Sequence, residues 1–302
     1  MGARLLIATL MGCVLATGLR ACAGGGPEPI PFTYAERCIF LELRAGGSED
    51  LLFLLDTGAS ASALDLKTVE RLGLTPTGTV QVEGTTGTIE ARWVRLPRLS
   101  TGKVGVDRLQ MTAQDLSGSL APPGRRLDGV LGADFLAHFA VTIDFEARNL
   151  TLATRLVRAG PAAGIAVPFT LDNGIPRLSG RLNGNIEADF RLDTGSSLFE
   201  SGDVYLNVPE TVWRRLREST PTPVPERALS GRGSGGEVVL PLARIEELAL
   251  GALVVPRPHV IVQPSVGYFA RPDAVGFVSN NLLEKHSPVT VDYPRRKLYF
   301  SK

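Results

Sequence analysis

Residues 53–60 read Phe-Leu-Leu-Asp-Thr-Gly-Ala-Ser, and residues 190–197 read Phe-Arg-Leu-Asp-Thr-Gly-Ser-Ser. In both stretches a largely apolar run ends in an aspartate, which a threonine and a glycine follow. A carboxylate at the end of a buried strand costs on the order of several kcal/mol unless it is hydrogen-bonded or shares a proton. Two such positions in one chain suggest that Asp56 and Asp193 lie together.

A second pair of segments repeats in the same order. Residues 142–145 read Thr-Ile-Asp-Phe, and residues 290–293 read Thr-Val-Asp-Tyr. Repeated segments in a fixed order indicate a duplicated architecture. The sequence therefore predicts an N-terminal lobe at 36–157, a linker at 158–164 and a C-terminal lobe at 165–302.

Composition favours an all-β fold with a few short helices. A chain of 302 residues exceeds the usual size of one hydrophobic core, so two lobes are expected. The 33 glycines and 21 prolines suit many short strands joined by turns. The net charge is only +1 and the basic residues are scattered, so nucleic acid is not an expected partner.

Apolar patterning predicts where individual elements lie. Helices are expected at 65–72 and 210–217, the second with Pro209 at its first turn. Alternating or continuous apolar runs predict strands at 38–44, 51–55, 80–83, 88–94, 104–112, 141–145, 149–153, 166–171, 177–182 and 186–192.

The paired aspartates suggest general acid and base chemistry that needs no metal. Two carboxylates side by side repel each other, which raises the pKa of one so that it stays protonated. The ionised partner can then take a proton from a water molecule, while the neutral partner donates a hydrogen bond to a substrate carbonyl. Asp56 and Asp193 are the predicted catalytic residues.

The neighbouring residues fit a supporting role. Gly58 and Gly195 let the backbone approach a carboxylate closely, because they carry no Cβ. Hydroxyl hydrogen bonds from Thr57 and Thr194 can lock the two loops together. These four residues are predicted to keep the pair of carboxylates rigid.

Three motifs resemble those of bacterial aspartic peptidases of the pepsin and retropepsin superfamily: residues 56–60, residues 193–197, and residues 127–136, which read Leu-Asp-Gly-Val-Leu-Gly-Ala-Asp-Phe-Leu. The resemblance covers most of 36–302. It implies a bilobal acid-protease fold with a pseudo-twofold axis and an active-site cleft between the lobes. It also implies a peptide or protein substrate and no cofactor. Retropepsins form homodimers, whereas this chain resembles two fused halves, so a monomer is expected.

The same resemblance implies a flap hairpin that closes over an extended peptide. Glycine-rich hairpin tips open and close at low cost. The candidate flap and substrate-binding residues are Gly84, Thr85, Thr86 and Gly87 in the first half and Gly233, Ser234 and Gly235 in the second.

The resemblance also bears on the two carboxyl groups. Ser196, as in pepsins, is expected to hydrogen-bond the ionised carboxylate and to make Asp193 the more acidic partner.

Some positions depart from the family pattern. Arg191 and Glu200 stand near Asp193, where relatives carry apolar or small residues. The counterpart of Gly132 in the second half is either Ser279 or a glycine at residues 275–276.

Residues 1–23 read as an export signal. A positive residue precedes an apolar run at 5–19, and small residues follow at 21–23. The run is shorter than the roughly 20 apolar residues that span a bilayer. Cys22 also resembles the acylated residue of a lipoprotein signal. Residues 24–35 are the expected linker, and the protein is expected to be exported as a periplasmic, envelope-bound or secreted protein.

The sequence predicts an aspartic endopeptidase; the alternative is a catalytically silent relative that binds peptides or an envelope component in the same cleft. The three histidines lack metalloprotease spacing, and no serine-hydrolase motif is present. Residues 231–236 match a dinucleotide-binding pattern, but a strand-like segment follows where a helix is required. Cys38 is expected to be a buried apolar residue.

Overall fold

The computed structural model describes residues 28–46, 49–154, 164–196, 203–219, 221–233 and 236–301. These ranges contain 23 strands, four short α-helices and two 3-10 helices, which confirms the β-rich fold. The predicted export signal with Cys22 lies outside the described residues, as do Ser234, Gly235 and Glu200. Of the predicted linker at 158–164, only Gly164 is described.

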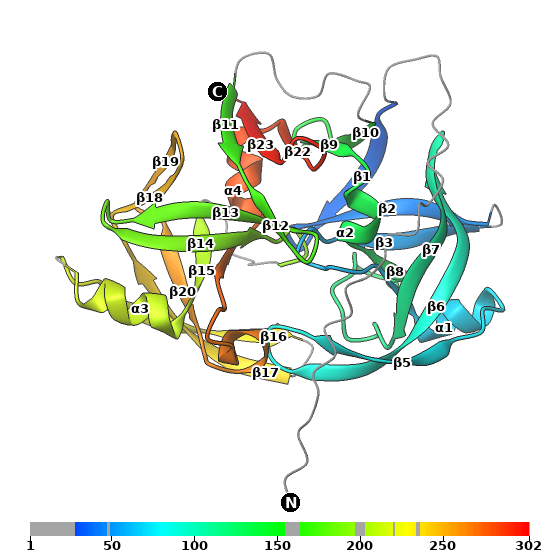
Figure 1. The fold of residues 1–302 in the computed structure, drawn as a ribbon, viewed down its shortest axis with the longest axis horizontal. Helices are drawn as coiled ribbons and strands as arrows, with labels where there is room; N and C mark the ends of the chain where they lie inside the picture. Colours follow the sequence, from blue (N-terminus) through cyan, green and yellow to red (C-terminus); the bar gives the residue numbers. More distant parts are fainter. Residues whose placement is uncertain are drawn as a thin grey trace, which may run out of the picture.

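A six-stranded central sheet joins the two halves, in the order β11-β23-β22-β9-β10-β1 (Figure 1). Its middle pair, β9 and β22, is antiparallel with Thr142 opposite Thr290, and the two hydroxyl oxygens are 2.8 Å apart. The repeated segments of the sequence thus meet at a local twofold axis. The strands are β1 (Ile30–Ala35), β9 (Ala140–Asp144), β10 (Asn149–Ala153), β11 (Gly164–Pro168), β22 (Val289–Asp292) and β23 (Lys297–Ser301).

The N-terminal half adds a sheet in the order β2-β3-β8-β4-β7-β6-β5. β3 and β8 pair in parallel, with Phe53 opposite Gly129. The elements are β2 (Cys38–Ala45), β3 (Glu49–Leu55), β4 (Ala63–Asp65), α1 (Leu66–Arg71), β5 (Thr77–Glu83), β6 (Thr88–Thr101), β7 (Val104–Gln114), β8 (Gly129–Leu131) and α2 (Ala133–Leu136).

The C-terminal half repeats this design. β14 and β21 pair in parallel, with Phe190 opposite Gly276. Gly276 therefore corresponds to Gly129, which is opposite Phe53 in the first half. Three residues farther along, Ser279, and not a glycine at 275–276, is the counterpart of Gly132. The elements are β12 (Thr170–Asp172), β13 (Ile175–Leu182), β14 (Ile186–Leu192), β15 (Tyr205–Pro209), α3 (Glu210–Arg217), β16 (Pro225–Gly233), β17 (Gly236–Arg244), β18 (Glu247–Leu250), β19 (Leu253–Pro256), β20 (His259–Gln263), η1 (Gly267–Ala270), β21 (Gly276–Val278), α4 (Asn280–Leu283) and η2 (Glu284–His286).

Three expectations about elements need correction. Residues 30–35 are not linker but strand β1, because the alternating side chains of Ile30 and Phe32 are buried in the core. The strand expected at 166–171 is two strands, since the chain leaves the central sheet after Pro168. Pro209 precedes α3 as its N-cap residue, where its missing N–H costs nothing.

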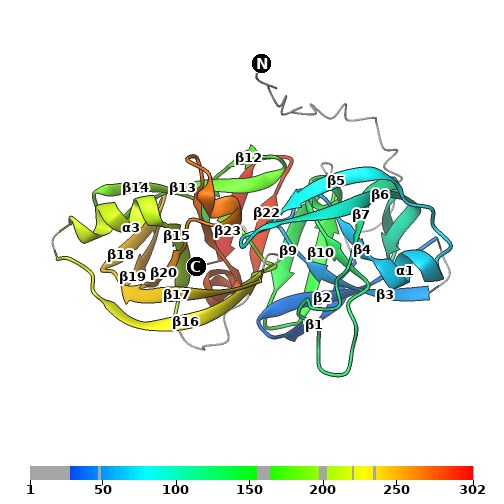
Figure 2. The same ribbon diagram turned by 90° about the horizontal axis from the view of Figure 1, so that it is seen from below.

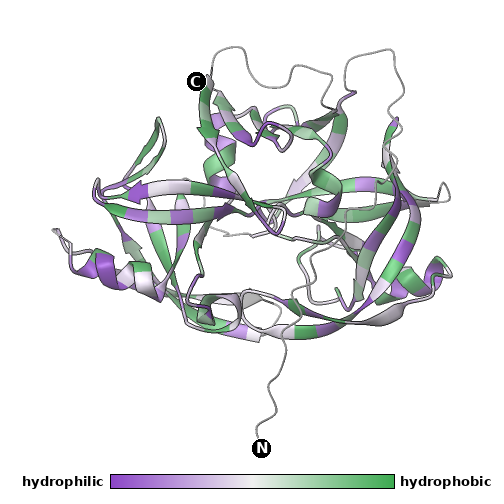
Figure 3. Ribbon diagram, in the orientation of Figure 1, coloured by the Kyte–Doolittle hydropathy of each residue, from purple (hydrophilic) through white to green (hydrophobic). Residues whose placement is uncertain are grey.

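Buried apolar side chains from both halves form one continuous core. Hydrophobic and hydrophilic residues alternate along the long strands β6 and β7 and along β13 and β14, as expected for sheets with one buried face (Figure 3). On the side away from the central sheet, the hairpins β5–β6 and β16–β17 extend toward each other (Figures 1 and 2). Within the described ranges, no helix has the length and apolar character needed to cross a membrane.

Candidate active site

Asp56 and Asp193 occupy matching places at the ends of β3 and β14. The N–H of Asp56 donates to the carbonyl of Leu131 at 3.0 Å, and the N–H of Asp193 donates to the carbonyl of Val278 at 2.9 Å. The parallel neighbours β8 and β21 therefore hold the backbone of the two aspartates in the same way.

The structure brings the two carboxyl groups together through the glycines that follow them. A Cβ placed on Gly58 would lie 2.7 Å from Cγ of Asp193, and one on Gly195 would lie 2.3 Å from Cγ of Asp56. Each glycine also donates its N–H to its own aspartate, at 2.8 Å for Asp56 and 3.0 Å for Asp193. Only a residue without Cβ fits against the opposite carboxyl group.

The two threonines interlock the loops. Thr57 Oγ1 donates to the carbonyl of Leu192 at 2.7 Å, and Thr194 Oγ1 donates to that of Leu55 at 2.8 Å. Each hydroxyl also accepts the backbone N–H of the other threonine, at 3.0 and 3.1 Å. Both side chains are fully buried, so this four-bond arrangement fixes the separation of the carboxyl groups.

Asn280 supports only the second loop, and sequence reasoning missed it. Its Nδ2 donates to the carbonyl of Thr194 at 2.8 Å and to that of Arg37 at 2.9 Å. The register places Ala133 at the corresponding position of the first half, where no side-chain amide is available.

Cys38 is buried, as expected, with its Sγ 3.8 Å from the carbonyl of Gly195.

Enclosure of the pair raises the pKa of both carboxyl groups. For Asp56 the cause is desolvation. For Asp193 desolvation and the neighbouring charge of Asp56 raise the pKa to about 8, which favours this carboxyl group as the protonated one of the pair. This order is the reverse of the one expected from Ser196, and which aspartate is the more acidic stays a prediction. Ser196 does contact Asp193, but through its backbone N–H at 2.9 Å.

The raised pKa of Asp193 predicts that stability falls with pH. An unfolded aspartate releases its proton near pH 4, whereas the folded group holds it to about pH 8. Stabilisation is thus complete below pH 4 and is lost as pH rises toward 8. The melting temperature should fall across this window, and the fall should be smaller in Asp193→Asn. Equal slopes in thermal melts of the two proteins would contradict the assignment.

Two hairpins stand at the predicted flap positions. The N–H of Gly84 donates to the carbonyl of Gly87 at 2.7 Å and closes the β5–β6 tip. Thr85 and Thr86 lie between these two glycines. In the β16–β17 hairpin, Gly233 is paired with Gly236. Whether either hairpin acts as a flap stays a prediction.

The β5–β6 tip rests on η1 of the other half. The N–H of Tyr268 donates to the carbonyl of Gly84 at 3.0 Å. Gly267, at φ +52°, is so close that a Cβ there would lie 2.5 Å from the nitrogen of Gly87. Arg271 pairs with Glu83 at 3.3 Å. Sequence reasoning did not find this contact, because no local motif marks η1.

Arg191, the atypical residue beside Asp193, helps to support this contact. Its guanidinium lies 4.2 Å from the ring centre of Tyr268 and pairs with Asp172 at 2.6 Å. A cation over an aromatic face is attracted to it. The departure from the family pattern thus has a structural explanation.

Substituting Gly267 is expected to release the tip. In Gly267→Ala the new methyl group would overlap the backbone of residues 84–87, so amides there should exchange hydrogen about tenfold faster or more. Gly184→Ala is the matched control, because Gly184 has φ +75° but no neighbour within 4 Å. Unchanged exchange at 84–87 would contradict the packing.

A comparison with curated proteins gave no match. A family model does match: residues 41–135 fit the one described as aspartyl protease. The matched region contains Asp56 and the segment 127–135, while Asp193 lies beyond it. The part of the chain that carries the first Asp-Thr-Gly motif is therefore similar to aspartyl proteases, which supports a peptidase function in general.

Proposed function

We propose that this protein is an aspartic endopeptidase, in which a water molecule between Asp56 and Asp193 hydrolyses peptide bonds. The observation that carries this proposal is the reciprocal packing of Gly58 and Gly195 against the opposite carboxyl groups. It leaves the two acids adjacent and desolvated, and the pKa of each is raised. Such a pair supplies a base and an acid at one point.

In the proposed reaction Asp56 starts ionised and Asp193 starts neutral, because the neighbouring charge of Asp56 raises the pKa of Asp193. Asp56, ionised, takes a proton from the water molecule as the water oxygen bonds to the peptide carbonyl carbon. Asp193, neutral, gives its proton to the carbonyl oxygen, which forms a neutral tetrahedral intermediate. Asp56 then passes its proton to the amide nitrogen, the carbon–nitrogen bond breaks, and Asp193 recovers a proton from a hydroxyl of the intermediate. Both carboxyl groups return to their starting states.

The remaining assignments follow from the sequence. The substrate is a peptide or protein that lies extended between the dyad and the hairpin tips. Because both aspartates come from one chain, a monomer suffices. The segment 1–23 directs export to the periplasm, envelope or exterior, with Cys22 as the candidate site of lipidation.

Digestion of a peptide library tests the proposal. The purified protein should cleave peptides, and an inhibitor that mimics the tetrahedral intermediate of aspartic peptidases should stop the cleavage. Cleavage that resists this inhibitor, or no cleavage between pH 3 and 8, would count against it.

A further inference from the structure

Asn280 lies beside the peptide group that holds the second aspartate. It is the first residue of α4 and is only 1% exposed, and its Nδ2 donates to the carbonyl of Thr194 at 2.8 Å. That carbonyl belongs to the same peptide group as the N–H of Gly195, which donates to Oδ1 of Asp193 at 3.0 Å. The amide of Asn280 therefore holds one end of this peptide group, while the carboxyl group of Asp193 holds the other.

The two N–H bonds of the Asn280 amide fix its orientation. One is used on Thr194, and the other donates to the carbonyl of Arg37 at 2.9 Å. The reverse orientation would place the amide oxygen against two carbonyl oxygens, and an oxygen of this kind can only accept hydrogen bonds. A side chain of the same shape without the NH2 group could therefore not make both contacts.

The carbonyl of Arg37 is itself held in place. Arg37 lies in the turn between β1 and β2 of the N-terminal half, and its guanidinium pairs with Glu284 of η2. The hydroxyl of Tyr34 donates to the same carboxylate at 2.7 Å. Because Glu284 follows α4 directly, this turn is fastened to the segment that carries Asn280. The amide thus bridges a fixed carbonyl of one half and the dyad loop of the other.

The first dyad loop lacks this side-chain support. The N–H of Gly58 donates to Oδ1 of Asp56 at 2.8 Å, as in the second loop. At the position that corresponds to the amide, however, Ala133 has no donor to offer to the carbonyl of Thr57. A hydrogen bond to a peptide carbonyl polarises the group and strengthens the bond that its N–H donates. The amide therefore acts on one carboxyl group of the pair and not on the other.

We propose that Asn280 is a positioning residue of the reaction, which orients the peptide group after Thr194 and, through it, the carboxyl group of Asp193. The inference rests on the proposed function, because it gives Asn280 a part in peptide hydrolysis. Since Asn280 is buried, it acts through the loop and not on the substrate. It keeps the acid of the dyad in the geometry in which its proton reaches the carbonyl oxygen.

Two variants separate positioning from packing. Asn280→Ala removes both donors, whereas Asn280→Asp keeps the shape of the side chain but not its NH2 group. In both, kcat for a peptide from the library digestion should fall at least about tenfold while KM stays within about twofold, because the substrate binds as before but the acid is displaced. Full kcat in Asn280→Asp with a loss in Asn280→Ala would mean that the side chain only fills space, and would overturn the inference.

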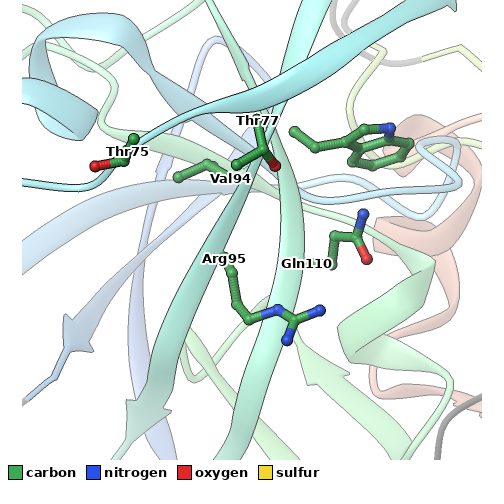
Figure 4. Close-up of a pocket in the computed structure, with 6 residues that line it drawn as sticks. Thr75, Thr77, Val94, Arg95 and Gln110 are labelled. Carbon is green, nitrogen blue, oxygen red and sulfur yellow. The ribbon is translucent and has the colours of Figure 1, made fainter.

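Two amides elsewhere in the chain provide matched controls. Asn207 is buried in the same half, and its Oδ1 accepts a hydrogen bond from Nε2 of Gln263 at 2.6 Å. Gln110 lines a hollow of about 320 Å³ on the N-terminal half, where it is paired with Arg95 (Figure 4). Asn207→Ala should lower the melting temperature as Asn280→Ala does, yet Asn207→Ala and Gln110→Ala should keep kcat within about twofold of the wild type. An equal loss of kcat in Asn207→Ala would show general destabilisation and overturn the inference.

Hydrogen exchange measured by NMR reads the same effect without turnover. The N–H groups of Gly195 and Ser196 both donate to Oδ1 of Asp193. In Asn280→Ala these two amides should exchange at least about tenfold faster than in the wild type, because their loop has lost a support. The N–H of Gly58 in the first loop should change less and serves as the internal reference.

The two readouts separate this inference from the proposed function. If the wild type cleaves no peptide but exchange at Gly195 depends on Asn280, the peptidase proposal fails and Asn280 still positions Asp193. If the wild type cleaves peptides and Asn280→Ala leaves either kcat or the exchange at Gly195 unchanged, the inference is wrong and the peptidase proposal stands.

Discussion

Replacing Asp56 by asparagine is expected to lower kcat/KM for peptide hydrolysis by at least about 10³-fold, because general acid and base catalysis contributes about 10²–10⁴-fold. An amide of the same shape cannot accept the proton of the attacking water. Asp193→Asn should lose a similar factor, since an amide can donate a hydrogen bond but cannot transfer and recover a proton. Initial rates on a peptide from the library digestion measure both losses.

Asp144→Asn is a suitable control for these variants. Asp144 belongs to a repeated segment as well, but its Oδ1 accepts the N–H groups of Glu146 and Ala147 in a turn. This change should leave turnover within a few-fold of the wild type. Full activity in Asp56→Asn would refute the mechanism. Tight peptide binding without turnover in the wild type would favour the silent binding protein instead.

Local patterns predicted the parts of the site that are close in sequence. An apolar run that ends in Asp-Thr-Gly implies a strand followed by a tight loop, and the structure has both at Asp56 and at Asp193. The repeated threonines at 142 and 290 indicated two related segments, and those segments pair directly. Each prediction needed only one segment or one repeat.

Local sequence patterns do not predict contacts between segments that are distant in the chain. Asn280 reaches Thr194 because α4 follows a three-residue strand whose pairing cannot be read from its own sequence. Gly267 is close to the β5–β6 tip only because the two halves face each other. Residues 30–35 form a strand because they pair with both β2 and β10, and β10 lies more than 100 residues farther along the chain.

Alanine at Gly195 should have the second large effect. Its Cβ would lie 2.3 Å from Cγ and 2.5 Å from Oδ2 of Asp56, so the loop or the carboxyl group must move. Because the threonine hydrogen bonds hold both loops, neither loop can move aside without straining these bonds. We expect kcat/KM to fall at least about 100-fold and the free energy of unfolding to fall by about 1–3 kcal/mol, as for other overpacked sites.

Gly58→Ala should behave alike, although less severely, because its Cβ would lie 2.7 Å from Cγ of Asp193. Gly118→Ala is the control, since Gly118 has nothing within 4 Å of an added Cβ. Denaturant unfolding and peptide cleavage, measured on all three variants, separate a local displacement from loss of the fold. If Gly195→Ala kept both wild-type stability and wild-type turnover, the glycine could not lie against Asp56. The two carboxyl groups would then not be close enough to share a proton, and the chemistry proposed for them would have no structural basis.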